Sequence, residues 1–285
     1  MSSKAPVNYT TILSIAGSDG SGGAGIQADL KTFAALGCYG LTVITDITVQ
    51  NTEGVHGSLA VPSTFVKEQF DVLAADIPIN AIKIGMISSA ATVRVIAKML
   101  RNRPSIPVIL DTVLKSSGGT ELASADSKNL IVQELFPLAT LVTPNLQEAA
   151  ALTGADRVPF AKSDIEKTAE ILRDKGAPAV LIKGGHMPGN RCEDYLLSAK
   201  GAAWFSSSRV ATKNTHGTGC TLSSAIAAYI AKGLDLHEAV REGRLFTAEA
   251  LYAGDRYVLG NGAGPLHHFY RCWNDFPSRG MRPTE

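Results

Sequence analysis

The sequence predicts an α/β protein in which helices cover both faces of a mostly parallel sheet. Two observations lead to this prediction. Apolar runs of strand length alternate with stretches of helical periodicity along most of the 285 residues, and a glycine-rich segment separates the first apolar run from the first helical stretch. Strands and helices that alternate in this way form parallel crossover units, and a parallel sheet needs cover on both faces.

The predicted elements follow in chain order. A strand at 12–16, a helix at 26–36 and a long strand at 41–49 form an opening βαβ unit. The pattern then predicts a helix at 65–75, a strand at 81–84, a helix at 91–101, strands at 108–110, 139–142 and 179–182, and helices at 218–231 and 236–253. The last helix starts with Asp235 and Glu238 in the spacing of a capping box. Residues 52–62, and residues 192–210 with a turn at Gly201, interrupt the alternation and predict functional loops or small β flaps.

Composition favours a globular protein that acts on small molecules. Apolar residues make up 45% of the chain and charged residues 19%, which is enough for a large core. The 27 basic and 26 acidic residues leave a net charge of +1, which argues against nucleic acid or an anionic membrane as the main partner. The apolar stretches are shorter than the roughly 20 residues of a membrane span, and residues 1–9 lack the apolar part of a secretion signal.

The cysteines and the chain ends add two expectations. The 4 cysteines, at 38, 192, 220 and 272, form no C-x-x-C motif and have no histidine at metal-ligand spacing, so we expect neither a disulfide framework nor a zinc site. This pattern predicts a reducing compartment, the cytoplasm. We also expect one domain at 11–273, with an N-terminal tail at 1–10 and a loose C-terminal tail at 274–285.

The first candidate ligand loop comprises residues 17–25, between the first strand and the first helix. Its glycines at 20, 22 and 25 match the dinucleotide pattern G-x-G-x-x-G. The acidic residue that should end the second strand of such a unit is missing, because Asp46 falls inside the strand and Gln50 stands at its end. The glycines could serve only a tight turn, but a strand-to-helix turn at this edge of an α/β sheet usually binds a ligand, and we expect a ligand loop.

The second candidate loop comprises residues 213–220 and leads directly into a helix of small residues. Gly217 and Gly219 would let the backbone N–H groups of residues 217–220 point at an oxyanion, with the positive end of the helix behind them. Cys220 would then lie at a helix N-terminus, where the pKa of a thiol is lowered and the thiolate can act as a base or nucleophile. The alternative is a buried small apolar residue. The chain has no Gly-Lys dipeptide, which excludes a P-loop.

Polar residues stand at the ends of the predicted strands, where an open α/β sheet binds its ligands. They are Gln50, Lys83, Asp111, Asn145 with Glu148, and Lys183. Asp111 is the strongest candidate to hold Mg²⁺ through water. Asn145 and Glu148 also have the spacing of a helix N-cap with its reciprocal glutamate, and the two lysines could be ordinary surface charges.

Seven motifs occur together in one order, from about residue 11 to residue 273. They are AGSDGSGGAGIQADLK at 16–31, VQNT at 49–52, KIGM at 83–86, TPNxxE at 143–148, KGGH at 183–186, NTHGTGCT at 214–221 and GxGPxHH at 262–268. With these motifs the sequence resembles the hydroxymethylpyrimidine and phosphomethylpyrimidine kinases of thiamine biosynthesis, within the ribokinase-like kinases. The resemblance implies a three-layer α/β/α sandwich, a homodimer, ATP with Mg²⁺, and two successive phosphorylations of 4-amino-5-hydroxymethyl-2-methylpyrimidine, first on the alcohol and then on the resulting phosphate.

The resemblance also implies roles for individual residues. Gln50 would read the edge of the pyrimidine ring, and the residues expected near that ring are Gly17, Asp19, Ala24, Met86 and Val113. Cys220 takes the place of the aspartate base of the sugar-kinase relatives. The residues expected to assist phosphoryl transfer with it are Lys183, Gly217, Thr218 and Gly219, of which Lys183, Thr218 and Gly219 would also bind ATP. The residues expected to serve Mg²⁺ and its waters are Asp111, Asn145 and Glu148.

Two departures from the family pattern and three alternatives accompany this prediction. Asp46 stands where the family usually has a small apolar residue, and residues 111–118 differ from the usual start of their loop. The alternatives are a pyridoxal kinase on the same fold, a catalytically silent pyrimidine-binding protein, and an oxidoreductase that rests on the 20–25 glycine pattern alone. The intact phosphate-handling set argues against the silent protein, and Gln50 favours a pyrimidine over pyridoxal.

Overall fold

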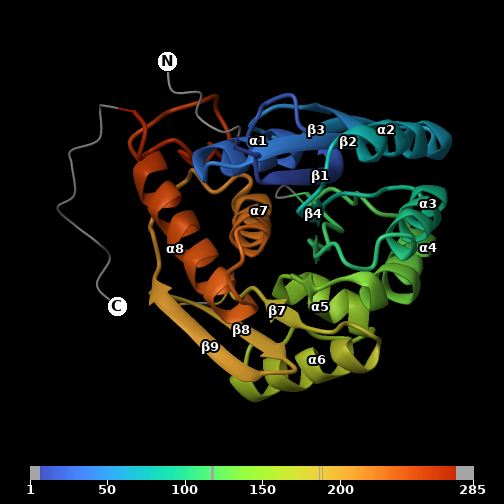
Figure 1. Ribbon diagram of the computed structural model, residues 1–285. Helices are drawn as coiled ribbons and strands as arrows, with labels where there is room; N and C mark the ends of the chain where they lie inside the picture. The colour runs from blue at the N-terminus through green and yellow to red at the C-terminus, as the bar shows by residue number, and fades with distance from the viewer. Residues whose placement is uncertain (1–6, 117–118, 186, 188, 274–285) are drawn as a thin grey trace.

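The computed structural model describes residues 7–116, 119–185, 187 and 189–273, and its course is shown in Figure 1. The strands are β1 (Thr11–Ser18), β2 (Tyr39–Gln50), β3 (Val55–Ala60), β4 (Ala81–Ile84), β5 (Val108–Leu110), β6 (Leu141–Val142), β7 (Val180–Ile182), β8 (Arg191–Ser198) and β9 (Gly201–Ser208). The α-helices are α1 (Gly25–Ala35), α2 (Ser63–Asp76), α3 (Ala90–Arg101), α4 (Ala125–Leu130), α5 (Leu146–Thr153), α6 (Lys162–Asp174), α7 (Thr218–Ala231) and α8 (Leu236–Gly254). A π-helix, η1 (Ile131–Leu135), and a 3-10 turn, η2 (Phe136–Leu138), follow α4. Residues 1–6 and the expected tail at 274–285 lie outside the described residues.

Within the described residues the strands form a nine-stranded sheet in the order β3-β2-β1-β4-β5-β6-β7-β8-β9. The six strands from β2 to β7 in this order are parallel to one another. At one edge β3 pairs antiparallel with β2, and at the other β8 and β9 are added as an antiparallel hairpin. Every residue of β4 and β5 is buried, as expected for strands covered on both faces. The predicted mostly parallel sheet is confirmed.

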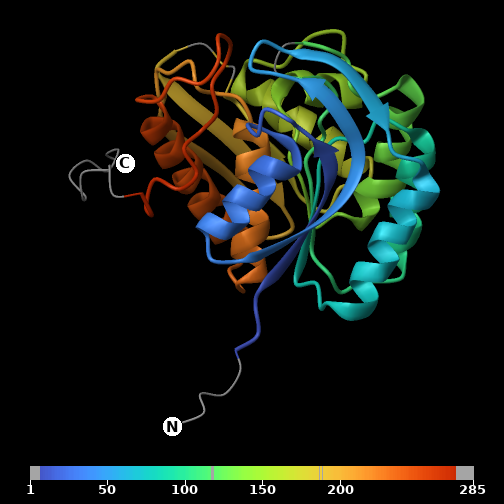
Figure 2. The same cartoon turned by 90° about the horizontal axis from the view of Figure 1, so that it is seen from above.

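Helices cover both faces of the sheet, which confirms the three-layer arrangement. On one face α1, α7 and α8 pack around a core that includes Phe33 and Phe246. On the other face α2, α3, α5 and α6 pack around a core that includes Phe70 and Ile96. In Figure 2 the long strand β2 curves strongly as it leads into β3. No helix of the described part of the chain is long and apolar enough to cross a membrane.

The predicted helices and strands appear with ends within two residues of those expected. The prediction for residues 52–62 is confirmed, because β3 forms a small flap against the end of β2. Residues 192–210 contain not a loop or a separate flap but β8 and β9, which turn at Gly201 and extend the central sheet. The pattern analysis did not predict α4 or α6.

The parallel strands bring several loops to one edge of the sheet. The loop at 19–24 follows β1, Gly85 and Met86 follow β4, and Asp111 follows β5. On the neighbouring strand β2, Gln50 is the last residue. The carboxyl ends of parallel strands are where ligands bind in open α/β sheets, and this edge therefore carries the candidate site.

Candidate active site

The two glycine-rich loops contact one another at the starts of α1 and α7. Gly217 caps α7 in the left-handed conformation, with φ of 85°. A β-carbon on Gly217 would lie 1.8 Å from the carbonyl oxygen of Gly23, so only glycine permits this approach. Thr218 begins α7, and its hydroxyl donates to the carbonyl of Thr215 (2.7 Å). The two loops that we expect to bind ligands therefore lie against one another.

The first loop is organised around the buried carboxylate of Asp19. Its Oδ1 accepts hydrogen bonds from the amide and hydroxyl of Ser21, and its Oδ2 accepts from the amides of Gly23 (3.1 Å) and Ala24 (2.8 Å). His216 Nε2 lies 2.8 Å from the same Oδ2. Burial opposes the charge, but these hydrogen bonds hold the pKa of Asp19 well below its usual value. Asp19 thus shapes the loop as an anion, and its expected contact with a substrate stays a prediction.

Lys183 and Asp111 form an ion pair beside the second loop. Lys183 Nζ lies 2.6 Å from Asp111 Oδ1, and Asp111 Oδ2 accepts a hydrogen bond from Ser223 (3.1 Å). Burial opposes both charges, yet each group favours the charge of the other, which raises the pKa of Lys183 and lowers that of Asp111. A β-carbon on Gly219 would lie 3.3 Å from Lys183 Nζ. The structure therefore places this ammonium group against the expected phosphate loop.

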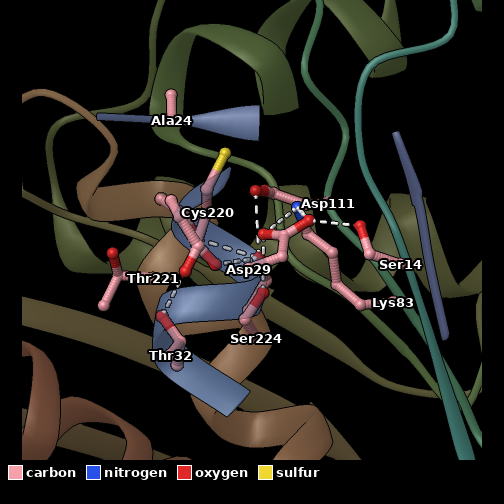
Figure 3. A network of polar contacts seen from close by, with 12 residues as sticks. Ser14, Ala24, Asp29, Thr32, Lys83, Asp111, Cys220, Thr221 and Ser224 are labelled. Carbon is pink, nitrogen blue, oxygen red and sulfur yellow. Dashed lines mark hydrogen bonds and ion pairs between the residues drawn. The ribbon is translucent and has the colours of Figure 1, made fainter. Parts of the chain in front are cut away.

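A second buried ion pair lies beneath Cys220, and Figure 3 shows its network. Lys83 Nζ lies 2.8 and 2.9 Å from the two carboxylate oxygens of Asp29, and both side chains are completely buried. Asp29 also accepts hydrogen bonds from Ser14 (2.6 Å) and Ser224 (2.7 Å). Lys83 lies inside β4 and is not a surface charge. Burial lowers the pKa of Lys83, but the ion pair with Asp29 and the further negative charge of Asp111 together outweigh that effect and raise it.

Cys220 corrects one expectation about the site. Its side chain lies above the Lys83 network near Ala24 (Figure 3), in the first turn of α7. Burial raises the pKa of the Cys220 thiol to about 11; Lys83 favours the thiolate, but the carboxylates of Asp29 and Asp111 oppose it. The prediction of a lowered thiol pKa was wrong for the ligand-free protein, because desolvation and two buried anions outweigh the helix N-terminus.

The structure brings together part of the expected pyrimidine site. A β-carbon on Gly17 would lie 3.2 Å from the sulfur of Met86 and 3.5 Å from the β-carbon of Asp46. Asp46 is buried, which raises the pKa of its carboxyl, and it accepts hydrogen bonds from Ser88. Asp46, which departs from the family pattern, therefore lies beside Gly17, one of the expected substrate contacts. Val113 follows further along the chain, two residues beyond Asp111, which itself comes directly after β5.

Asn145 and Glu148 form the capping box that their spacing predicts. The Asn145 side chain accepts from the Glu148 amide (2.9 Å), and the Glu148 carboxylate accepts from the Asn145 amide (2.8 Å) at the start of α5. Burial, helped by the charge of Asp111 and opposed by that of Lys183, raises the pKa of Glu148 to about 7. Asn145 also bridges to Lys183 along the sheet edge. The capping role is confirmed, and a role in metal binding stays a prediction.

His216 is the site residue that the motif analysis quoted but gave no role. Its Nε2 lies 2.8 Å from Asp19 Oδ2 and 3.3 Å from the side-chain nitrogen of Gln50. A β-carbon on Gly23 would lie only 2.2 Å from Cδ2 of this ring. Three segments that are distant in the sequence thus meet at one imidazole.

The fold and the site define a class of protein. A mostly parallel sheet covered on both faces, with two glycine-rich loops meeting at its carboxyl edge beside a buried lysine, is the arrangement of a ribokinase-like small-molecule kinase. The sequence profile described as phosphomethylpyrimidine kinase matches residues 19–267, and the chain belongs to this family of phosphotransferases.

Known relatives agree with this assignment. The chain is 46% identical over 263 residues to the hydroxymethylpyrimidine/phosphomethylpyrimidine kinase of Rhizobium meliloti (strain 1021), covering 92% of this chain and 98% of the relative. It is 41% identical over 261 residues to the protein of that name from Escherichia coli (strain K12), with coverage of 92% and 98%. These findings confirm the predicted kinase and remove the oxidoreductase alternative.

Two solved structures show the same fold. The phosphomethylpyrimidine kinase of Clostridium difficile 630 is similar with a TM-score of 0.74 at 38% identity, covering 85% of this chain and 99% of that one. An ADP complex of Bacillus subtilis pyridoxal kinase is similar with a TM-score of 0.82 at 32% identity, covering 92% and 98%. The fold is therefore shared by kinases with two different names, and the substrate must be argued from the site.

Proposed function

We propose that this protein transfers the γ-phosphoryl group of ATP to 4-amino-5-hydroxymethyl-2-methylpyrimidine and then phosphorylates the monophosphate to the diphosphate, in thiamine biosynthesis. The observation that supports the proposal is the meeting of the two glycine-rich loops: Gln50 contacts His216 of the second loop, and Lys183 lies beside Gly219 at the start of α7. A pyrimidine reader and a phosphate-binding loop at one sheet edge suit direct transfer between two bound molecules.

Gln50 is the proposed reader of the pyrimidine ring. A primary amide offers a donor and an acceptor side by side, which complements a ring nitrogen next to an exocyclic amino group. The other proposed contacts to the ring are Gly17, Asp19, Ala24, Met86 and Val113. The contact between Gly17 and Met86, and the place of Ala24 at the start of α1, support this group.

The loop before α7 is the proposed phosphate site. The amides of Gly217, Thr218 and Gly219 lie at the positive end of α7, which favours an anion there. Lys183 adds a full positive charge beside Gly219, and Asp111 holds that lysine in place. Phosphoryl transfer depends mainly on positioning and on neutralising the charge of the transferred group, and these residues would supply both.

Cys220 is the proposed base for the first phosphorylation. It lies in the first turn of α7, directly after the proposed phosphate loop, and its side chain lies near Ala24, one of the proposed pyrimidine contacts (Figure 3). The thiolate would accept the proton of the substrate hydroxymethyl group as that oxygen attacks phosphorus. The second phosphorylation uses a phosphate oxygen that is already ionised, so Cys220 has less to contribute there.

Mg²⁺ fits the oxygen ligands at this sheet edge, as a water-held ion. Both oxygens of Asp111 already have partners, and Glu148 completes the α5 capping box. Among the described residues no group of three His, Cys, Asp or Glu side chains converges on one point. We therefore propose that Asp111, Glu148 and the Asn145 side chain hold waters of the ion. When bound, Mg²⁺ neutralises phosphate charge.

Two further properties belong to the proposal. Ile47, Val49 and Leu59 are between 50% and 69% exposed, and Ile47 pairs with Leu59 across β2 and β3, so this apolar face of the flap is the proposed contact of a homodimer. A change of Ile47 to Lys should then give monomers in light scattering. The 4 cysteines, all within the described residues, are free thiols, which supports the cytoplasm as the proposed compartment, and residues 11–273 are proposed to act as one domain.

Pyridoxal kinase is the second candidate, because pyridoxal kinases share this fold. The experiment that separates the two incubates the protein with Mg-ATP and, in separate reactions, the hydroxymethylpyrimidine, its monophosphate and pyridoxal, and identifies the products by mass. The proposal predicts that the first two compounds are phosphorylated much faster than pyridoxal. Phosphorylation of pyridoxal alone would overturn it.

A further inference from the structure

His216 has no assigned role, although it joins three parts of the site. It comes from the loop before α7, while Asp19 comes from the loop after β1 and Gln50 from the end of β2. The ring is buried, and the α-carbon of Gly23 packs so closely on it that no larger residue would fit there. The position of the imidazole is therefore fixed by packing as well as by hydrogen bonds.

The hydrogen-bond partners determine which nitrogen of His216 carries a hydrogen. Asp19 Oδ2 lies 2.8 Å from Nε2, and an ionised carboxylate can only accept. Nε2 must therefore be the protonated nitrogen, whether the ring is neutral or charged. With its hydrogen directed to Asp19, Nε2 cannot accept from the amide of Gln50 3.3 Å away, and an NH₂ group there would face another N–H. The amide end that faces His216 is therefore the oxygen, which shares this hydrogen as a second and weaker acceptor.

Thr48 imposes the same orientation on Gln50 from the opposite side. Thr48 Oγ1 lies 2.9 Å from the carbonyl oxygen of Ser18 and 3.1 Å from the second end of the Gln50 amide. The hydroxyl has one hydrogen. It donates this hydrogen to the Ser18 carbonyl, because a carbonyl oxygen can only accept. The Thr48 oxygen then has lone pairs free to accept, so the amide end facing it must be NH₂. A half-turn of the amide, which exchanges its oxygen and nitrogen in place, satisfies Thr48 and His216 together.

We propose that His216 is a positioning residue that sets the orientation of the Gln50 amide and thereby the order in which its donor and acceptor face the substrate ring. The inference rests on the proposed role of Gln50 in reading the pyrimidine. Asp19 Oδ2 accepts the Nε2–H of His216, Gln50 Oε1 faces the same N–H at the longer distance of 3.3 Å as a second, shared acceptor, and Gln50 Nε2 donates to Thr48. One amide hydrogen and one oxygen lone pair of Gln50 then remain for the ring, in a fixed order.

This arrangement selects for the chemistry of the substrate. An aminopyrimidine offers an acceptor nitrogen beside an amino donor, which a fixed amide can match with two hydrogen bonds. The pyridine ring of pyridoxal has no amino group beside its nitrogen. A fixed amide therefore favours the aminopyrimidine, whereas an amide free to turn would discriminate less.

The test replaces His216 in two ways. His216→Phe keeps a ring of similar size and removes the N–H, whereas His216→Gln keeps a donor at about the place of Nε2. We expect His216→Phe to raise KM for the hydroxymethylpyrimidine about 10- to 100-fold, the usual effect of losing a hydrogen bond to a charged or oriented group. KM for ATP should change by less than about threefold, and His216→Gln should recover part of the loss.

Two controls separate positioning from a general loss of structure. His237, on α8, contacts Ser198 and belongs to no part of the site, so His237→Phe should leave both KM values unchanged. In a Gln50→Leu background, His216→Phe should add less than about twofold to the pyrimidine KM, because its effect passes through Gln50. The inference would be overturned if the increases in pyrimidine KM caused by His216→Phe and Gln50→Leu multiplied in the double variant. It would also be overturned if His216→Phe raised the KM values for the pyrimidine and for ATP equally.

A second readout does not depend on activity. In ¹⁵N-labelled protein the nitrogen shifts of His216 should show a hydrogen on Nε2, and Asp19→Asn should alter these shifts. The Nδ1–H form would overturn the inference even in a fully active enzyme. If the wild type instead fails to phosphorylate the pyrimidine while His216 shows the Nε2–H form, the proposed function fails and the hydrogen-bond assignment stands.

Discussion

The pH dependence of the first phosphorylation tests whether Cys220 is the base. With a thiol pKa of about 11, the ligand-free enzyme carries the thiolate in only about one molecule in a thousand at pH 8. Each unit of pH below the pKa changes that fraction tenfold. If the thiolate takes the substrate proton, the rate of the first transfer should rise about tenfold per unit between roughly pH 7 and 9.

Two comparisons isolate this effect. The second phosphorylation starts from a phosphate whose pKa is about 6, so its rate should be nearly flat over the same range. Cys220→Ala should lose the slope of the first step and slow it by about 10²- to 10⁴-fold at pH 9. Single-turnover experiments with saturating Mg-ATP measure both steps without product release. A flat wild-type profile, or an equal slope in Cys220→Ala, would refute the assignment of the base.

Three further predictions concern the buried charges and the loops. Lys83→Met leaves the buried Asp29 without its ion pair and should lower the free energy of unfolding in urea by about 3–5 kcal/mol. Adding Asp29→Leu should recover much of that loss. A decrease of less than about 1 kcal/mol in Lys83→Met would contradict the burial of the pair. Glu148→Gln keeps a side chain that can complete the capping box, so it should raise the Mg²⁺ concentration for half-maximal rate without a large change in stability, and an unchanged titration would leave Glu148 with the cap alone. Gly217→Ala and Gly233→Ala both place alanine at positive φ, and each should cost about 1–2 kcal/mol of stability. Only the alanine at 217 would collide with the carbonyl of Gly23, so only Gly217→Ala should also weaken ATP binding in calorimetry.

Much of the fold could be predicted because its central strands are short, apolar and buried on both faces. β4 and β5 have the predicted ends, since every residue in them is buried. The hairpin β8–β9 was harder, because β9 contains exposed serines and lacks the apolar run of a central strand. The helix α6 had a detectable signal: Ile165, Ala169 and Leu172 are buried at helical spacing on an otherwise polar segment.

The sequence predicted which polar residues and loops lie at this edge of the sheet, but not their electrostatics. Glycine spacing and helix starts identified both loops because these features are local in the sequence. The pairing of Lys83 with Asp29 joins residues 54 positions apart, and no local pattern marks Asp29 inside a helix. The thiol pKa of Cys220 depends on two carboxylates from other elements, so reasoning from its helix position alone gave the wrong direction. His216 likewise gains its role only from contacts across the fold.

Competition between the two candidate alcohols is the most direct test of whether the substrate is the aminopyrimidine or pyridoxal. The enzyme is given Mg-ATP with equal concentrations of 4-amino-5-hydroxymethyl-2-methylpyrimidine and pyridoxal, and the ratio of the products, measured by mass at low conversion, gives the ratio of the two kcat/KM values. We expect pyrimidine phosphates to dominate by at least about tenfold, and Gln50→Leu to shift the ratio towards pyridoxal phosphate. A wild-type ratio that favours pyridoxal phosphate, or one that Gln50→Leu leaves unchanged, would contradict this expectation.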